Sequence, residues 1–409
     1  MSVKNIRAVI GKGFGDEGKG LCVDYFCAKE PDSLVIKHNG GAQSGHTVET
    51  GDKRFIFHQL SAGSFRRSDT FWAETYYPDL YKLGEEILEF HTLTGFSPRI
   101  YADININVTI LDDVLINMLL ETMRADKRHG SCGMGINEAY LRSNAGYGIK
   151  ISELFSSSAE DLVRKISSIR EEYVRERLLQ EGINLSEKSS GNEYLEMLSS
   201  KVALDNFVDE MMRNAEQYVT PIGDVKALLE KRESIIFETG QGLLLDADYE
   251  RYSPHLTMSK TGLTNSVNIL DKHNMLLTEA VYVTRSYVTR HGAGPLPYEC
   301  DKTDVGVKEI DKTNIQNEWQ GSIRYARHGS YEEFVSLVAD DVENNIGDNA
   351  EMSVSLFITH LNETDDKICM TEGDVDYKEF LNNRLIRDTF DMFYLSDDRE
   401  STKTKIISK

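Results

Sequence analysis

The sequence has few cysteines and few prolines, and it contains no long apolar segment. Its five cysteines, at positions 22, 27, 132, 300 and 369, are odd in number and form no CxxC pair, which argues against a disulfide framework or a zinc site. No apolar run approaches the roughly 18 residues that a membrane-spanning helix needs. The first residues, MSVKNIRAVIGKG, lack the apolar core and cleavage site of a secretory signal. We therefore expect reduced thiols and a cytoplasmic protein that does not enter a membrane.

Positive charge is also scarce. The 46 Lys and Arg residues are outnumbered by 67 Asp and Glu residues, which gives a formal net charge of −21. No block of five or more basic residues interrupts this balance. Because an acidic chain repels polyanions unless it carries a strong local basic patch, we expect neither a nucleic acid nor an anionic membrane as a partner.

The chain is long enough to bury a large core, since 40% of its 409 residues are hydrophobic. With only seven prolines, and with no linker, low-complexity tract or internal repeat, it predicts one large domain over residues 1–409. Charged, amphipathic sequence over 155–232 predicts a helical insertion within that domain. A second domain at this insertion is the alternative.

Strand patterns alternate with helix patterns along the chain, which predicts an α/β fold with a large, mainly parallel central sheet covered by helices. Expected strands lie at 6–10, 34–38, 55–59, 234–237, 277–284 and 352–359. Expected helices lie at 21–28, 78–90, 111–123, 157–179 and 192–231. Residues 129–148 and 238–246 read as loops, and the polar tail from Ser396 is expected to fray in part.

The first strand runs into a glycine-rich loop, Gly13-x4-Gly18-Lys19, and then into a helix. This order is typical of a P-loop-like nucleotide-binding unit, in which backbone N–H groups surround phosphate oxygens and the lysine meets the terminal phosphate. Gly20 stands where Ser or Thr normally binds magnesium, so Asp16 is the candidate for either a metal ligand or a base. The alternative is a glycine-rich turn with solvated charges.

A second glycine-rich loop, residues 39–47, follows the second expected strand and contains His46. Histidine handles protons near neutral pH. Parallel strands bring the loops at their carboxyl ends to one edge of the sheet, so we expect His46 near the phosphate loop. A purely structural histidine is the alternative.

Four segments, GFGDEGKG, NGGAQSGHT, FETGQGLLLD and TRHGAGPLPYE, occur in this order and together resemble the adenylosuccinate synthetase family. The resemblance covers most of the chain. It implies a mainly parallel α/β ligase that acts as a homodimer. Such an enzyme joins aspartate to carbon 6 of inosine monophosphate, with GTP as phosphoryl donor and Mg²⁺ as the metal.

The resemblance also implies roles for individual residues. Asp16 corresponds to the base that removes the N1 proton of the purine and also binds magnesium, while Gly45 supplies a backbone carbonyl to the metal. His46 corresponds to the acid that stabilises O6 and the phosphoryl group in transfer, and Lys19 neutralises charge. Gln241 corresponds to the glutamine that orients the purine, although it could instead cap a strand–loop junction.

Two larger groups of binding residues follow from the same resemblance. Those expected to bind the donor nucleotide are Gly13, Gly15, Glu17, Gly18, Lys19, Gly20, Gly45, Thr47, Arg324 and Asn362. Those expected to bind the acceptor nucleotide or aspartate are Asn39, Gln43, Ser131, Cys132, Arg142, Gln241, Thr257, Ser322 and Arg324.

The sequence departs from the family pattern where the acceptor nucleotide is bound. The phosphate-binding Thr-Thr-Gly-Arg-Gly becomes Ser131-Cys132-Gly133-Met134-Gly135, which loses a hydroxyl donor and a positive charge. The arginine that reaches across the dimer aligns with Gly146, and Arg142 is the possible substitute. Ser322 replaces an arginine that contacts ribose and aspartate, while Arg324 is kept.

The segments expected to bind the donor base also differ from the family pattern. The guanine-reading Lys-x-Asp becomes His360-Leu361-Asn362, and Gly-Pro-Asp-Arg becomes Ser396-Asp397-Asp398-Arg399. An asparagine accepts with one oxygen and adds donors, so guanine specificity should weaken and ATP or dATP could be admitted.

The main interpretation is therefore a ligase that phosphorylates O6 of a purine nucleoside monophosphate, by default inosinate, and then adds aspartate. One alternative is the phage branch of the family, which acts on deoxyguanylate and also lacks the ribose-reading arginine. A second is a nucleotide-binding regulatory pseudoenzyme on the same fold. The sequence leaves the acceptor and the donor base open.

Overall fold

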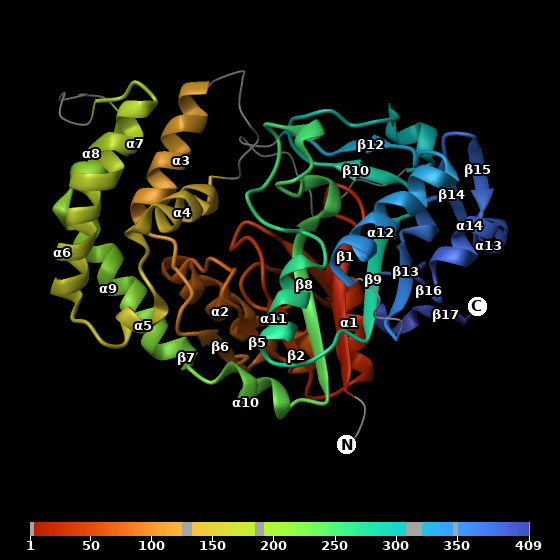
Figure 1. The fold of residues 1–409 in the computed structure, drawn as a ribbon, viewed down its shortest axis with the longest axis horizontal. Coiled ribbons are helices and arrows are strands. Elements are labelled where there is room, and N and C mark those ends of the chain that lie inside the picture. Colours follow the sequence, from red (N-terminus) through yellow and green to blue (C-terminus); the bar gives the residue numbers. More distant parts are fainter. Residues whose placement is uncertain (1–3, 125–132, 185–191, 308–320, 347–350, 409) are drawn as a thin grey trace.

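A ten-stranded sheet forms the centre of the computed structural model, which describes residues 4–124, 133–184, 192–307, 321–346 and 351–408 (Figure 1). The strand order is β17-β16-β13-β9-β1-β8-β2-β5-β6-β7, and every neighbouring pair is parallel except β16 with β17. The strands span Asn5–Gly11 (β1), Leu34–Lys37 (β2), Asp69–Trp72 (β5), Ile100–Asp103 (β6), Val219–Ile222 (β7), Ser234–Gly242 (β8), Glu279–Arg285 (β9), Ser353–Thr359 (β13), Met392–Leu395 (β16) and Lys405–Ser408 (β17). The predicted α/β fold with a mainly parallel sheet is confirmed.

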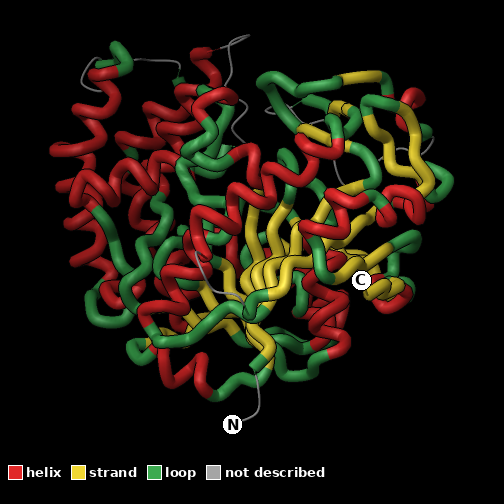
Figure 2. Tube along the Cα trace, turned by 45° about the vertical axis from the view of Figure 1, so that its right-hand side comes forward, coloured by secondary structure: helices red, strands yellow, loops and turns green. Residues whose placement is uncertain are grey.

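Helices cover both faces of this sheet (Figure 2). On one face α1 (Lys19–Lys29), α2 (Leu80–Thr94) and α9 (Lys201–Tyr218) contribute to one large apolar cluster. On the other face α10 (Val225–Glu230), α11 (Thr264–Lys272) and α12 (Tyr331–Ile346) contribute to a second. Central strands contribute side chains to both clusters, since Val9 of β1 belongs to the first cluster and Ala8 of β1 to the second. This explains why the central strands read as continuous apolar runs.

Local sequence sets the ends of α2. The side chain of Asp79 accepts a hydrogen bond from the Lys82 N–H at 3.2 Å, which caps the first turn. Gly95, with φ of 78°, ends the helix in the left-handed conformation that glycine adopts most readily.

A helical region lies to one side of the sheet (Figure 1). Its helices are α3 (Leu111–Arg124), α4 (Ile136–Arg142), α5 (Ile151–Leu154), α6 (Ala159–Ile169), α7 (Arg175–Gln180), α8 (Glu193–Ser199) and α9. Two expectations are corrected here. The segment 133–148 is largely helical rather than a loop, with α4 followed by a π-helical turn at Ser143–Tyr147. The segment 155–232 is not wholly helical, because β7 joins the edge of the central sheet.

Three other expectations also need correction. The strand expected at 55–59 is β4 (Lys53–Phe57), but it pairs with β3 (His46–Thr50) in a separate antiparallel hairpin. The strand expected to end at residue 237 continues to Gly242, so the expected loop begins later. The C-terminal tail ends in β17, which pairs antiparallel with β16, so it is ordered edge strand up to Ser408.

Three further features complete the fold. Small sheets are formed by β10 (Val288–Arg290), β12 (Arg324–Ala326) and β11 (Glu299–Cys300), and by β14 (Lys367–Met370) with β15 (Gly373–Asp376). Short helices α13 (Tyr377–Asn382) and α14 (Arg384–Thr389) precede β16.

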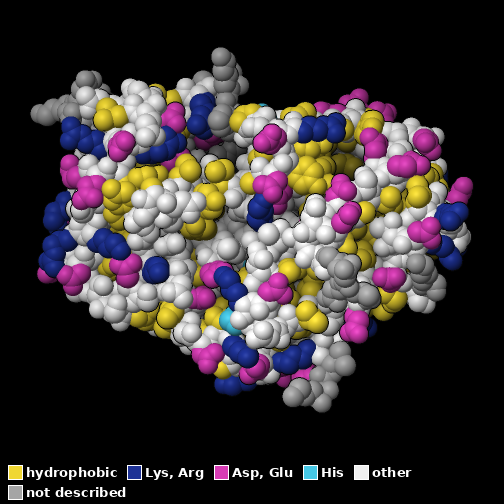
Figure 3. All heavy atoms as spheres, in the orientation of Figure 1, with side chains coloured by type: hydrophobic (Ala, Val, Ile, Leu, Met, Phe, Trp, Pro, Cys, Tyr) yellow, Lys and Arg dark blue, Asp and Glu magenta, His cyan; other side chains and the backbone are white. Residues whose placement is uncertain are grey.

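Among the residues that the structure describes, no helix is both long and apolar enough to span a bilayer. On the face in Figure 3, basic side chains are interspersed with acidic ones.

Candidate active site

A cavity of about 780 Å³ lies where the loops after β1, β2, β8, β9 and β13 come together. These loops leave the carboxyl ends of parallel strands, which is where ligands bind in open α/β sheets. The expected residues that line it are Gly15, Asp16, Glu17, Gly18, Lys19, Gly20, Gln43, Gly45, His46, Thr47, Gln241, Thr257 and Asn362. The structure therefore brings the phosphate loop and the His46 loop together.

The phosphate loop folds tightly because three of its residues adopt positive φ. Gly15 has φ of 96°, Asp16 of 61° and Gly18 of 92°. Gly20 packs against the second loop, since a Cβ atom at Gly20 would lie 2.9 Å from the carbonyl oxygen of Thr47. Close packing of the two loops thus explains glycine at the position where phosphate loops usually carry Ser or Thr.

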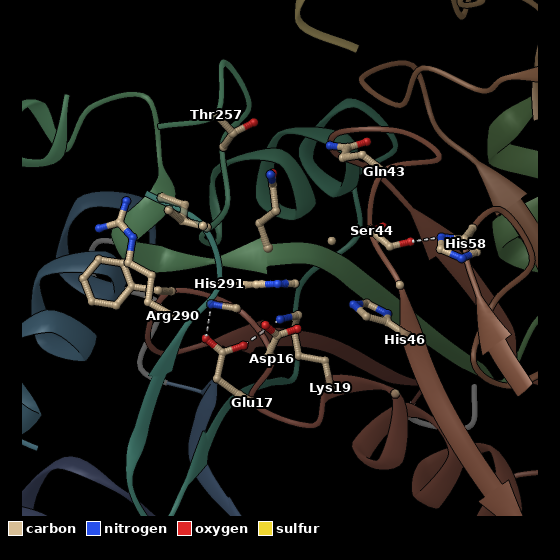
Figure 4. A pocket seen from close by; sticks show the side chains of 18 of the residues that line it. Asp16, Glu17, Lys19, Gln43, Ser44, His46, His58, Thr257, Arg290 and His291 are labelled. Atoms are coloured by element: carbon tan, nitrogen blue, oxygen red, sulfur yellow. Dashed lines mark hydrogen bonds and ion pairs between the residues drawn. The ribbon is translucent and has the colours of Figure 1, made fainter. Parts of the chain in front are cut away.

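The carboxylate of Glu17 lies inside this loop. It accepts hydrogen bonds from the N–H groups of Gly13 at 3.0 Å and Gly15 at 2.8 Å, and it pairs with the Lys19 ammonium at 2.7 Å (Figure 4). Burial alone would raise the pKa of Glu17, but Lys19 and the loop N–H groups outweigh burial and lower it. Glu17 is therefore an anion held by the groups expected to hold phosphate.

Asp16 lies beside His291 and Lys19 in the same cavity (Figure 4). Burial raises the pKa of its carboxyl above the ordinary value, although Arg285 and Lys19 oppose that rise. The Arg285 Nε atom donates to the Asp16 carbonyl at 2.6 Å, which holds the backbone in its left-handed conformation. A carboxylate with a raised pKa can accept a proton more readily than an ordinary one.

His46 is held by Glu238. Its Nδ1 atom is hydrogen-bonded to the Glu238 carboxylate, which also accepts from the Ala62 N–H at 3.2 Å and lies 3.8 Å from the Lys37 ammonium. Burial would raise the pKa of Glu238, but Lys37 and His46 lower it to about 2. Burial lowers the pKa of His46, with Glu238 opposing, so the imidazole is neutral, and an anion bound beside it would favour the protonated form.

Four buried polar atoms of the second glycine-rich loop and of β8 have no hydrogen-bond partner within the described residues. They are Asn39 Nδ2, Gln43 Oε1, His46 Nε2 and Gln241 Oε1, and all of these residues except Asn39 line the cavity. The other end of Asn39 is occupied, because its Oδ1 accepts from the Gly240 N–H at 2.8 Å. Buried polar groups are usually paired, so a set of unpaired donors and acceptors indicates a polar ligand with both kinds of edge.

Magnesium fits the oxygen donors of this site. Asp16 and Gly45 line the same cavity and offer a carboxylate and a backbone carbonyl, which are donors that Mg²⁺ prefers. Across the described residues no three His, Cys, Asp or Glu side chains gather into a metal-binding set. A metal held here would therefore share its coordination with ligand oxygens or water, as magnesium sites with phosphates do.

Arg142 does not belong to this site, which corrects its expected role. Its guanidinium is fully buried and makes two hydrogen bonds of 2.9 Å to the Asp113 carboxylate. Its remaining bonds go to the carbonyls of Val108 at 2.9 Å and Tyr147 at 2.6 Å. Arg142 therefore joins α4 to α3 and has no donor directed at a nucleotide phosphate.

Arg324 and Ser322 also lie outside the cavity lining. The Arg324 guanidinium binds Glu299 at 2.9 Å and the carbonyls of Gly292 at 3.1 Å and Gly294 at 2.6 Å. It stabilises the loop after β10 in this structure. Gly13 lines a neighbouring cavity, and Ser131 and Cys132 are outside the described residues.

Glu238 and three histidines were missed from the sequence. Glu238 sits in the quoted FETGQG segment, but its partnership with His46 joins residues 192 positions apart. The missed histidines that line the cavity are His58, His255 and His291. A buried acid at the end of a predicted strand was the available signal for Glu238.

Known proteins resemble the chain over most of its length. A family model described as adenylosuccinate synthetase matches residues 8–322. The adenylosuccinate synthetase of Clostridium botulinum (strain Eklund 17B / Type B) is 29% identical over 323 residues, which cover 74% of this chain and 67% of that protein. The enzyme of Sordaria macrospora is 26% identical over 346 residues, covering 82% and 74%.

Two solved structures share the fold. Adenylosuccinate synthetase from Plasmodium falciparum superposes with a TM-score of 0.67 at 17% identity, covering 99% of this chain and 87% of that one. Cyanophage S-2L succinoaminodeoxyadenylate synthetase (PurZ), bound to dGMP and to dATP as an energy donor, superposes with a TM-score of 0.61 at 14% identity, covering 98% and 95%.

Proposed function

The chain belongs to the adenylosuccinate synthetase family, and on that premise we propose that it joins aspartate to a purine nucleoside monophosphate at the expense of a nucleoside triphosphate. The observation that carries this proposal is the convergence of Asp16, Lys19, His46 and Gln241 on one cavity. A regulatory protein without catalysis would have no need for an acid–base pair beside a phosphate loop.

The reaction needs two steps because the 6-oxo group of a purine is a poor leaving group. Asp16 removes the N1 proton, so that O6 becomes nucleophilic and attacks the terminal phosphorus of the donor. The bond to the β-phosphate oxygen breaks, and 6-phosphoryl purine and nucleoside diphosphate result. The amine of aspartate then attacks C6, inorganic phosphate leaves, and the amine loses a proton.

His46 and the loop cations stabilise this transfer. With the Nδ1–H donated to Glu238, the Nε2 atom faces no other described partner, and once protonated it donates a hydrogen bond to O6 or to the phosphoryl group. Lys19 offsets phosphate charge. Magnesium on Asp16 and Gly45 would supply further charge neutralisation at the phosphates.

The unpaired atoms of Gln43, Asn39 and Gln241 suit the acceptor base. A purine presents donors and acceptors along one edge, and amide side chains can match both. Their burial makes the match selective, because a base lacking the matching group would leave them unpaired.

Phosphate release tests the proposal. We expect release from GTP, ATP or dATP with Mg²⁺ only when a purine monophosphate and aspartate are both present, and mass spectrometry should show a product heavier by the aspartate residue. Inosinate, guanylate and their deoxy forms make the panel. No aspartate-dependent release with any acceptor and donor would overturn the proposal.

A second candidate acceptor is deoxyguanylate, with ATP or dATP as donor. One observation favours this acceptor. Within the described residues 321–326 no arginine lines the cavity, because the Arg324 guanidinium binds Glu299 and two backbone carbonyls instead. A site without that arginine loses a donor to a ribose hydroxyl. A kcat/KM at least tenfold higher for deoxyguanylate than for guanylate would support this candidate.

We also propose that the enzyme acts as a cytoplasmic homodimer, as the family resemblance implies. Light scattering coupled to size-exclusion chromatography would give twice the 46.3 kDa chain mass. A monomer that is fully active would contradict the dimer.

A further inference from the structure

Glu17 competes with phosphate for the phosphate loop. Its carboxylate uses two loop N–H groups, those of Gly13 and Gly15, and the ammonium of Lys19. The proposed function assigns Lys19 to the donor phosphates, and the family resemblance implies that Gly13 and Gly15 bind the donor as well. Two anions cannot share one small set of donors without strong repulsion, so phosphate binding requires the carboxylate to move.

Glycines surround the carboxylate and leave it room. A Cβ atom at Gly11 would lie 2.3 Å from Glu17 Oε2, and one at Gly242 would lie 2.6 Å from Oε1. Any larger residue at these positions would collide with the carboxylate. The carboxylate therefore lies against backbone at these two positions.

Glu17 lines two cavities, which also share Phe14, Gly15 and Arg285. The second cavity has a volume of about 330 Å³. Lys12 lines only the second cavity, next to aromatic side chains that include Phe14 and Phe334. A carboxylate that leaves Lys19 can therefore turn toward Lys12.

Lys12 lacks an acceptor in the present arrangement. Its side chain is 7% exposed, and its ammonium lies 3.7 Å from the ring centroid of Phe334. Its backbone N–H donates to the Val283 carbonyl at 2.8 Å, but within the described residues its ammonium makes neither an ion pair nor a hydrogen bond. Burial lowers the pKa of Lys12 to about 7, although Glu17 opposes that effect. A buried amine without an acceptor is costly, so its presence beside Glu17 needs an explanation.

We propose that Lys12 is a positioning residue that receives the Glu17 carboxylate when a nucleotide phosphate enters the loop. Glu17 then has two positions, on Lys19 when the loop holds no phosphate and on Lys12 when it does. Lys12 favours nucleotide binding by offering the displaced anion a buried cation. This inference rests on the proposed binding of a triphosphate at the loop.

Direct binding measurements on the full chain test it. Titration calorimetry with GTP and ATP, in Mg²⁺ and without acceptor, gives the dissociation constant for wild type, Lys12→Met, Glu17→Gln and the double variant. We expect Lys12→Met to weaken binding at least tenfold and Glu17→Gln to tighten it by a similar factor. The double variant should match Glu17→Gln, because without the anion Lys12 has nothing to receive.

Lys29→Met is the matched control, since this lysine also lies over an aromatic ring, 5.8 Å from the Tyr25 centroid, but lines neither cavity. It should leave nucleotide binding unchanged. Lys12→Arg should restore part of the affinity lost in Lys12→Met, which a change in packing alone would not.

Three results would overturn the inference. One is an equal effect of Lys12→Met in the wild-type and Glu17→Gln backgrounds. Another is a Glu17→Gln variant that binds GTP and ATP no more tightly than wild type does. This result is decisive even if Lys12→Met fails to fold. The last is wild type that binds no triphosphate, and that result would also remove the proposed function, whereas the first two leave it intact.

Discussion

The Nδ1 atom of His46 is hydrogen-bonded to the buried carboxylate of Glu238, and its Nε2 atom is unpaired within the described residues. A carboxylate on one ring nitrogen selects the tautomer and increases the basicity of the other nitrogen. Glu238 is itself placed by Lys37 and by the Ala62 N–H. The pair thus behaves as a unit aimed at the reacting groups, with Glu238 acting through the histidine.

Substitution of this pair should slow turnover more than it weakens binding. His46→Ala should lower kcat and kcat/KM together by about 10²–10⁴-fold, since the interaction is made in the transition state. Glu238→Gln should give a smaller loss in the same direction, because the ring remains but its orientation is less defined. Steady-state kinetics with the acceptor varied would show this. A rise confined to KM would make His46 a binding residue instead.

Asp16→Asn should abolish turnover and leave nucleotide binding largely intact. The substitution preserves the shape of the side chain but removes the base, and a positioned base usually raises the rate by about 10²–10⁴-fold. It also removes the carboxylate from the expected magnesium site. Rapid-quench kinetics would measure the phosphoryl transfer step, and calorimetry the binding. Asp248→Asn is the control, because that exposed acid pairs with Lys260 outside the cavity. Near-normal turnover with every acceptor would exclude Asp16 as the base.

Much of this arrangement was predictable from local sequence. The first strand, phosphate loop and helix α1 follow from an apolar run, a glycine pattern and a helix-like segment that are contiguous. The meeting of Asp16 and His46 follows from one rule about parallel strands. Those expectations needed no knowledge of distant contacts.

The expectations that were wrong concern partners that sequence does not reveal. Arg142 carries a charge suited to phosphate, but Asp113 and two carbonyls bury it completely. The tail looked polar, yet Lys405–Ser408 needs only backbone hydrogen bonds to pair with β16, and it stays exposed as an edge strand. Both outcomes depend on which segments meet in space.

The buried pair formed by Arg142 and Asp113 should be important for stability. Arg142→Met leaves an uncompensated carboxylate in the core, which typically costs about 3–5 kcal/mol. Denaturant unfolding would measure the loss. Arg164→Met is the matched control, because its ion pair with Asp161 is exposed to solvent and should contribute little to stability. Equal effects of the two substitutions would contradict the structural role of Arg142.

Stability should also depend on pH through Asp341. Burial raises the pKa of this carboxyl to about 6, while the Tyr282 hydroxyl and the Leu263 N–H, which donate to it, oppose the rise. Since the folded pKa exceeds the unfolded value of 3.8, the protonated group stabilises the fold below about pH 4, and this stabilisation is lost as pH rises through about 6.

Asp341→Asn cannot titrate, so wild type should lose about 2 kcal/mol relative to the variant between pH 4 and pH 7, at about 1.36 kcal/mol per pKa unit. Denaturant unfolding at both pH values would give the difference. A constant gap between the two proteins would show that the carboxyl titrates normally in the folded state.

The choice of donor base should depend on Asn362, which lines the cavity near Asp398 and Arg399. The family resemblance implies that an aspartate at this position reads guanine by accepting from N1–H and the 2-amino group. Asparagine keeps one acceptor and adds a donor, which can pair with N1 of adenine. We expect ATP or dATP to support turnover with kcat/KM at least comparable to that of GTP.

Asn362→Asp should raise the kcat/KM for GTP relative to that for ATP by at least tenfold. The aspartate restores a second acceptor oxygen, which repels the lone pair on N1 of adenine. The Asp398 carboxylate is poorly placed to compensate, since it already accepts from the Glu400 N–H at 2.9 Å and the Lys403 ammonium at 2.7 Å. Side-by-side kinetics with ATP, dATP and GTP at saturating acceptor would measure both proteins. A wild-type preference for GTP of about 100-fold, or roughly 2.7 kcal/mol, would show that Asn362 still reads guanine.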